Sequence, residues 1–320
     1  MTRSLIAWGL IVVVGLAALA GCAAPTSSPV APVAGQPGIK VLAVETFLAD
    51  IAQNVAGDRL TVAALIPIGV DPHAFEPTPQ DVARIAESQV LIVNGAGFEG
   101  WLESVLKNAG GKRMVIEASR GLAMREPEEA GMAHAGEGEA DHPHEGDPHF
   151  WLDPVLAIRY VENIRDGLSA ADPAGKETYA ANAAAYIAQL NELHHWILAQ
   201  VATIPPERRL LVTNHESFGY FADRYGFTIV GAVIPSVSSG ASPSAQQMAQ
   251  LVEHIKATGA PAIFLETGSN PQLARQLAQE AGVKTVTELY THSITESDGP
   301  APTYIEMIRF NVKTIVDALK

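Results

Sequence analysis

The chain has 320 residues, of which 48% are hydrophobic and 18% are charged, and its formal net charge is −14. This charge argues against a nucleic-acid partner, because such proteins need a basic surface that neutralises phosphates. The only cysteine is Cys22, which excludes an intramolecular disulfide.

Residues 1–21 have the pattern of a secretory signal peptide. A basic residue, Arg3, precedes an apolar run from Leu5 to Leu19, and two small residues separate this run from Cys22. This order is typical of an export signal. The ending resembles a bacterial lipobox and predicts that Cys22 is lipidated, which would anchor the mature chain outside the cytoplasm. A plain signal peptide with a chance cysteine and an uncleaved anchor are the alternatives.

Residues 22–38 are rich in Pro, Ala, Ser and Gly, which predicts a flexible tether. About 280 residues follow, more than one compact core usually holds, so we expect two lobes. We place the first lobe at 39–172, a linking helix at 173–204 and the second lobe at 205–320. No segment after the signal is long and apolar enough to cross a membrane.

The first lobe alternates short β-branched runs with helical stretches. This alternation predicts an α/β fold in which a mostly parallel sheet is flanked by helices. The expected strands are Ile39–Val44, Leu60–Leu65, Val90–Asn94 and Met114–Ile116, and the expected helices are Phe47–Ala56 and Pro79–Ala86.

Residues 125–147 lack a strand or helix pattern and are dense in Glu, Gly, Asp and His. They predict an acidic loop on the first lobe. Its histidines, His134, His142 and His144, could collect metal weakly. A solvated loop without a binding role is the interpretation that we favour.

One long helix is expected between the lobes. After Gly175 no proline or glycine interrupts the chain until about Thr203, and apolar residues recur at helical spacing. A helix of about 27 residues would be about 40 Å long and would act as a stiff spine. His194 and His195 lie on it, and we expect both to be structural or solvated.

The alternating pattern returns in the second lobe. Ser242-Pro243 predicts a helix start with a serine cap, and Thr303 with Glu306 fits a capping box. The expected strands are Leu210–Thr213, Thr228–Val233, Ala262–Leu265 and Lys284–Val286, and the expected helices are Phe218–Tyr225, Pro243–Ala257, Pro271–Ala281 and Tyr304–Leu319.

Four histidines lie just past apolar, strand-like runs, two in each predicted lobe. In open α/β sheets ligands bind beyond the carboxyl ends of the strands. Four imidazoles gathered there could hold one divalent transition metal in the crevice between the lobes. These residues are His73, His149, His215 and His292.

Two of these histidines share a local motif, Asp71-Pro72-His73 and Asp147-Pro148-His149. Proline fixes its own φ and biases the preceding aspartate toward extended backbone. Each histidine is therefore expected on a stiff turn. No His-Glu-x-x-His motif of zinc proteases occurs in the chain.

Four segments resemble the zinc and manganese substrate-binding proteins of bacterial ABC importers. The resemblance covers nearly all of the chain after Ile39, in the family's order. It implies two α/β lobes joined by one rigid helix, with a buried metal at their interface. The segments are Gly69–Pro79, Asp147–Pro154, Thr213–Phe221 and Tyr304–Asn311.

The resemblance also implies the ligands. His73 and His149 match the two first-lobe ligands, and His215 matches a third position that is usually histidine in zinc members and often glutamate in manganese members. His292 stands where the family commonly has aspartate, so the fourth ligand departs from the pattern. Glu266 is the reserve carboxylate. We favour for it a role as the hydrogen-bond partner of a ligating imidazole or as a helix-start residue.

This resemblance implies capture of Zn²⁺ outside the cytoplasmic membrane and its delivery to a permease that a separate ATPase powers. We expect a monomer that is not an enzyme, anchored at the cell surface or in the periplasm. An all-imidazole shell suits Zn²⁺ better than Mn²⁺, which prefers carboxylate oxygen.

Three alternatives remain at this point. The first is manganese or iron uptake by the same kind of protein. The second is a zinc hydrolase in which three histidines hold the metal and water takes the fourth place. The third is a surface adhesin or metal scavenger that works without a permease.

Overall fold

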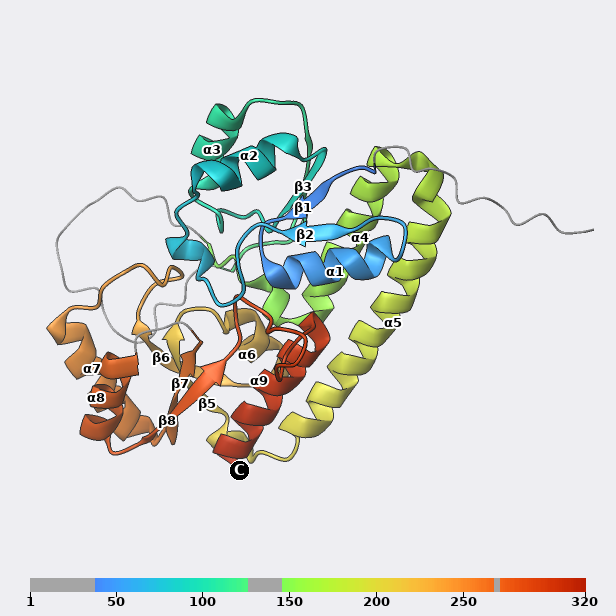
Figure 1. The fold of residues 1–320 in the computed structure, drawn as a ribbon. Coiled ribbons are helices and arrows are strands. Elements are labelled where there is room, and N and C mark those ends of the chain that lie inside the picture. Colours follow the sequence, from blue (N-terminus) through green and yellow to red (C-terminus); the bar gives the residue numbers. More distant parts are fainter. Residues whose placement is uncertain (1–37, 126–145, 268–270) are drawn as a thin grey trace, which may run out of the picture. The chain divides into compact units, whose positions relative to one another are not determined.

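The computed structural model describes residues 38–125, 146–267 and 271–320 (Figure 1). The predicted signal peptide, Cys22 and almost all of the tether lie outside the described residues. So do His134, His142 and His144 of the acidic loop. Within the described ranges, no helix combines the length and the apolar character that a membrane span requires.

The first lobe contains a four-stranded parallel sheet in the order β2-β1-β3-β4. The expected α/β architecture is therefore confirmed. Helix α2 begins with a capping box formed by Thr78 and Asp81, with Pro79 at the first helical position. The elements are β1 (Val41–Ala43), α1 (Thr46–Ala56), β2 (Val62–Ala64), α2 (Pro79–Glu87), β3 (Val90–Val93), α3 (Leu102–Ala109), β4 (Met114–Glu117) and α4 (Pro154–Ala171).

Strand β3 is buried on both faces, which is why its sequence is a continuous apolar run. Leu91 and Val93 pack with residues of α2 and α3. Val90 and Ile92 point to the other face, where they join the core built with α1, α4 and α5. Helices thus cover both faces of the sheet. The loops that follow the carboxyl ends of its strands can therefore form the site.

The second lobe contains two parallel strand pairs, β5-β6 and β7-β8, and β5 also lies next to β7. Val212, Ile263 and Leu265 pack with α7 and α8, whereas Leu211 and Phe264 face the core shared with α9. The elements are β5 (Leu210–His215), α6 (Gly219–Tyr225), β6 (Thr228–Ile234), α7 (Ala245–Thr258), β7 (Ala262–Glu266), α8 (Pro271–Ala281), β8 (Lys284–Leu289) and α9 (Tyr304–Leu319).

The predicted spine is helix α5 (Lys176–Val201), which has 26 residues. It packs against α1 and α4 of the first lobe and against α6 and α9 of the second (Figure 1). His194 Nδ1 lies 3.1 Å from the hydroxyl of Tyr225, and His195 is exposed. The expectation that these two histidines are structural or solvated fits their positions. The residue boundaries of the lobes stay a prediction.

Two helices, α3 and α4, were not predicted, and most of the predicted boundaries differ by one to three residues. Helix α7 is capped by Ser244, not Ser242, because Ser244 and Gln247 form a reciprocal capping box that satisfies two backbone N–H groups. Strand β5 extends through His215, so this histidine ends the strand and does not follow it in a turn. Arg125 and Asp147, expected in the acidic loop, pair as an antiparallel bridge at its base.

Candidate metal centre

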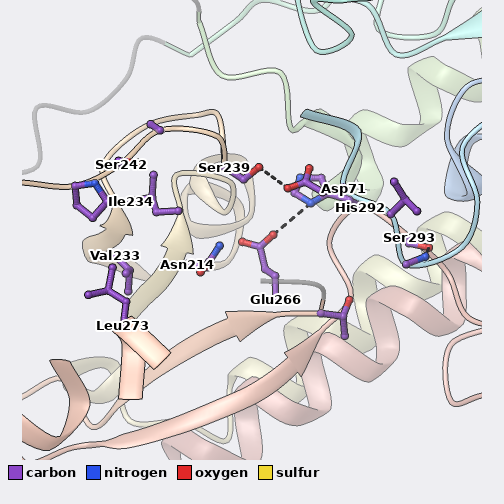
Figure 2. A pocket seen from close by; sticks show the side chains of 15 residues that line it. Asp71, Asn214, Val233, Ile234, Ser239, Ser242, Glu266, Leu273, His292 and Ser293 are labelled. Carbon is purple, nitrogen blue, oxygen red and sulfur yellow. Dashed lines mark hydrogen bonds and ion pairs between the residues drawn. The ribbon is translucent and has the colours of Figure 1, made fainter. Parts of the chain in front are cut away.

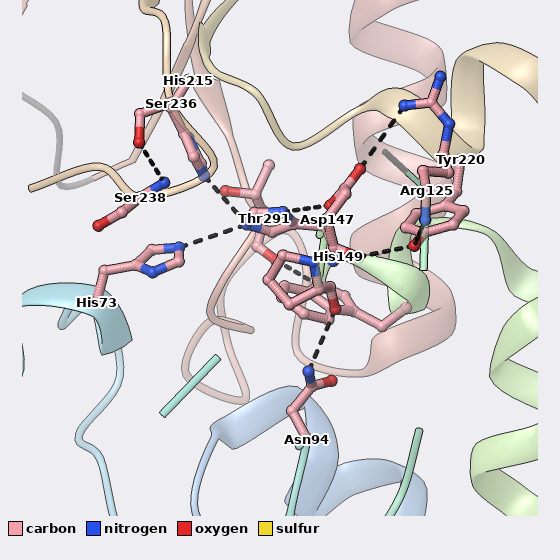
Figure 3. Close-up of polar contacts among 12 residues, drawn as sticks. His73, Asn94, Arg125, Asp147, His149, His215, Tyr220, Ser236, Ser238 and Thr291 are labelled. Atoms are coloured by element: carbon pink, nitrogen blue, oxygen red, sulfur yellow. Dashed lines mark hydrogen bonds and ion pairs between the residues drawn. The ribbon is translucent and has the colours of Figure 1, made fainter. Parts of the chain in front are cut away.

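The structure brings the four predicted histidines together. One ligand atom from each lies within 4.8 Å of the others. Figure 3 shows His73, His149 and His215 of this group. His149 Nε2 is 3.4 Å from His73 Nε2 and 3.2 Å from His215 Nε2. Three of the rings are buried and His73 is half-buried. Four nitrogens this close can form the tetrahedral shell that Zn²⁺ adopts in proteins.

The two Asp-Pro-His motifs build the same local turn. Asp71 Oδ1 accepts a hydrogen bond from the backbone N–H of His73, and Asp147 Oδ1 accepts one from that of His149, both at 2.9 Å. Such an aspartate turn fixes the backbone two residues on. The aspartate therefore adds to the stiffness that proline alone was expected to supply.

His215 and Glu266 end the neighbouring strands β5 and β7, so both reach the same sheet edge. Glu266 Oε1 lies 2.6 Å from His215 Nδ1, and Glu266 Oε2 lies 3.3 Å from Nδ1 of His292, which follows β8. The Glu266 carboxylate thus contacts the Nδ1 atoms of both imidazoles. Their Nε2 atoms are left to face the centre of the histidine cluster. This position fits the partner role favoured for Glu266.

His292 completes the set. Its Nε2 is buried and has no hydrogen-bond partner within the described part of the chain. The loop that carries it is fixed by Trp151, whose Nε1–H donates to the Thr291 carbonyl at 2.7 Å. Trp151 also packs 5.1 Å from the His149 ring, and Phe98 packs 4.8 Å from the His73 ring, between centroids. A buried ring nitrogen without a hydrogen-bond partner remains available to bind a metal ion.

A second carboxylate lies behind His149, whose Nδ1 is 2.8 Å from Asp147 Oδ1. Asp147 is held from the other lobe by Tyr220, whose hydroxyl donates to the Asp147 carbonyl at 2.7 Å and accepts from the Arg125 N–H at 2.9 Å. Arg125 Nη1 lies 3.9 Å from Asp147 Oδ2. The orientation of His149 thus depends on contacts that cross between the lobes.

Burial sets the protonation of most of these rings. It lowers the pKa of His73 to about 4 and lowers those of His149 and His292 well below 6.5, and neighbouring rings add to the effect. Burial also opposes charge on His215, but the Glu266 carboxylate outweighs it and raises the pKa of His215. Three imidazoles are therefore neutral at pH 7, as ligation requires.

Two further carboxylates near the centre have different places. Asp71 holds the backbone of His73 and not its ring. Glu216 lines a small cavity beside Asp147. Sequence reasoning missed Arg125 and Tyr220 as positioning residues, because no local pattern connects positions 95 residues apart.

Replacing Asp147 by alanine is expected to weaken metal binding by about 10- to 100-fold, the usual cost of losing a partner behind a histidine ligand. The cause is the loss of both hydrogen bonds that orient His149. Asp147→Asn keeps an acceptor oxygen and should lose less. Competition titration against a metal chelator measures the difference, and equal affinities for the alanine variant and the unmodified protein would contradict this role.

Comparisons with known proteins agree with this geometry. A family model described as zinc-uptake complex component A, periplasmic (ZnuA), matches residues 41–318. The manganese-binding lipoprotein MntA of Halalkalibacterium halodurans is 36% identical over 282 residues, which are 88% of this chain and 89% of MntA. The zinc-binding lipoprotein AdcA of Streptococcus pneumoniae is 35% identical over 280 residues, which are 86% of this chain and 55% of AdcA.

A solved structure shows the same fold. It is a manganese-bound mutant of the periplasmic metal binding protein of Candidatus Liberibacter asiaticus, with a TM-score of 0.77 and 28% sequence identity. The match covers 88% of this chain and 99% of that one.

Proposed function

This chain belongs to the ZnuA family of metal-binding substrate-binding proteins of ABC transporters, and we propose that its cargo is Zn²⁺. In this proposal the protein captures Zn²⁺ outside the cytoplasm and delivers it to a permease. The ligands are His73, His149, His215 and His292. The observation that carries the proposal is their convergence, with one ligand atom of each within 4.8 Å of the others.

The donor set favours zinc over manganese. Four imidazole nitrogens suit Zn²⁺, whereas Mn²⁺ prefers carboxylate and carbonyl oxygen. Glu266, the reserve oxygen donor, has its oxygens next to His215 Nδ1 and His292 Nδ1. The relatives alone do not decide, because MntA is named for manganese and AdcA for zinc.

Manganese is the second candidate, and two observations favour it. MntA is 36% identical to this chain. Glu266 Oε2 lies 3.3 Å from His292 Nδ1, so a manganese site could exchange these two groups. In that arrangement Glu266 would supply oxygen to the ion, and His292 would move aside.

Calorimetry of metal-free protein with each ion tests the choice. We expect Zn²⁺ to bind at least about 100-fold more tightly than Mn²⁺, following the general preference of nitrogen sites. Co²⁺ absorption should show four-coordinate geometry. Tight Mn²⁺ binding with weak Zn²⁺ binding would reverse the assignment of the cargo.

The remaining features support a transport role over catalysis. In this proposal His292 takes the fourth place around the ion, whereas catalytic zinc sites keep that place for water. We propose that the protein is a monomer anchored through lipidated Cys22. Membrane fractionation of a Cys22→Ala variant tests the anchor, and zinc-dependent hydrolysis that is lost in His73→Ala would favour an enzyme instead.

A further inference from the structure

A cavity of about 330 Å³ borders the candidate metal centre (Figure 2). His292 and Glu266 line its inner end, and Ser242 lies in its wall. The loop between β6 and α7, residues 235–244, forms part of the wall from the second lobe. The cavity therefore connects a loop of the second lobe with the ligands.

A hydrogen bond joins the two lobes across this cavity. Ser239 Oγ, in the β6–α7 loop, donates to Asp71 Oδ2 at 2.5 Å (Figure 2). The other oxygen of Asp71, Oδ1, accepts from the backbone N–H of His73 at 2.9 Å. A continuous chain of contacts thus runs from Ser239 through Asp71 to a proposed metal ligand.

His73 depends on this chain more than the other ligands depend on theirs. The rings of His149, His215 and His292 each lie beside a carboxylate, which is Asp147 or Glu266. His73 is the least buried of the four, and Asp71 holds it by its backbone. Its place is therefore set by the turn that Asp71 closes.

Other joints between the lobes are held by several contacts at once. Ser293 accepts from the N–H of Gly69 at 2.9 Å and contacts Thr46. On the far side, Arg125 pairs with Asp223 at 2.7 Å. The Ser239–Asp71 bond ties a half-buried loop to a half-buried turn, so it can open with little disruption of the core.

We propose that Ser239 is a positioning residue for metal capture. Through Asp71 it keeps His73 in the ligand shell, and its hydrogen bond must break before the ion can leave through the cavity. Ser239 therefore sets how long the ion stays bound. This inference rests on the proposed function, with a divalent cation as the cargo.

The test is the rate at which Zn²⁺ leaves the full-length protein when an excess of chelator is added in a stopped-flow instrument. We expect Ser239→Ala to release the ion about 10- to 100-fold faster, the effect of losing one hydrogen bond to a charged carboxylate. Ser239→Thr keeps a hydroxyl and should restore slow release. The Co²⁺ spectrum should stay four-coordinate in both variants, because all four ligands remain.

Ser242→Ala is the matched control. Ser242 lines the same cavity, and the structure gives its side chain no hydrogen bond to a described residue. Its release rate should equal that of the unmodified protein. In an Asp71→Ala background, Ser239→Ala should add nothing further, because the two residues act as one unit.

Three outcomes would overturn the proposal. They are a release rate in Ser239→Ala within twofold of the unmodified rate, the same acceleration in Ser242→Ala, or additive effects with Asp71→Ala. These outcomes differ from failure of the proposed function. If the cargo assignment is wrong, the unmodified protein itself binds Zn²⁺ weakly, and no release phase is seen in any variant.

Discussion

Replacing His149 by alanine is expected to reduce the affinity for Zn²⁺ by more than about 100-fold, since loss of an outer partner alone costs about 10- to 100-fold. His149 is the central member of the set, with its Nε2 3.4 Å from His73 Nε2 and 3.2 Å from His215 Nε2. Its removal leaves three nitrogens and a gap in the middle of the shell. Calorimetry or chelator competition at pH 7.5 measures the loss.

His195→Ala is the matched control for this experiment. His195 is exposed on α5, outside the candidate centre, so its replacement should leave the affinity unchanged. Thermal unfolding of the metal-free variants separates loss of a ligand from loss of the fold. If His149→Ala still bound Zn²⁺ as tightly as the unmodified protein, the assigned ligand set would be wrong.

Affinity for Zn²⁺ is expected to fall about tenfold for each unit of pH below the raised pKa of His215. The sign follows from the metal-free state. With its pKa above 6.5, His215 carries a proton at slightly acidic pH, and the ion must displace it. His73 has a pKa of about 4, so it adds a second competing proton only near that pH.

Glu266→Gln separates the contribution of the carboxylate. The amide keeps an acceptor beside His215 Nδ1 but removes the negative charge that raises the pKa of His215. We expect the fall in affinity to begin at lower pH in this variant. The affinity at its plateau should be lower by about 10- to 100-fold.

Competition titrations from pH 8 to pH 5 on both proteins measure these slopes. A fall in affinity much steeper than tenfold per pH unit would mean that several histidines release protons together when the metal binds. An unchanged onset in Glu266→Gln would remove Glu266 as the cause. His195→Ala again serves as the control, because a change in an exposed histidine should alter neither slope nor onset.

The strands of the described residues could be predicted because most of them are apolar, β-branched runs that end in turn residues. Strand ends were less accurate, as β5 shows by running through His215. Helix α4 (Pro154–Ala171) was missed although Asp153 and Pro154 mark its start. Its buried residues recur at helical spacing, so the signal was present in the sequence.

The site was predictable where chemistry is local to the sequence. The Asp-Pro-His motifs and the histidines at strand ends indicated the four candidate ligands. Tyr220, Ser239 and Arg125 could not be found in this way, because each acts on a residue of a distant segment. Such contacts depend on how the two lobes pack against each other. No short sequence pattern indicates which distant residues will meet.

Helix α5 has a consequence for how an importer tells a filled carrier from an empty one. The helix is continuous over 26 residues, and it packs against helices of both lobes. Bending it would break backbone hydrogen bonds and expose buried side chains, so a wide clamshell swing is disfavoured. The importer would then have to recognise small rearrangements around the metal centre. Small-angle scattering should accordingly give nearly equal radii of gyration with and without metal.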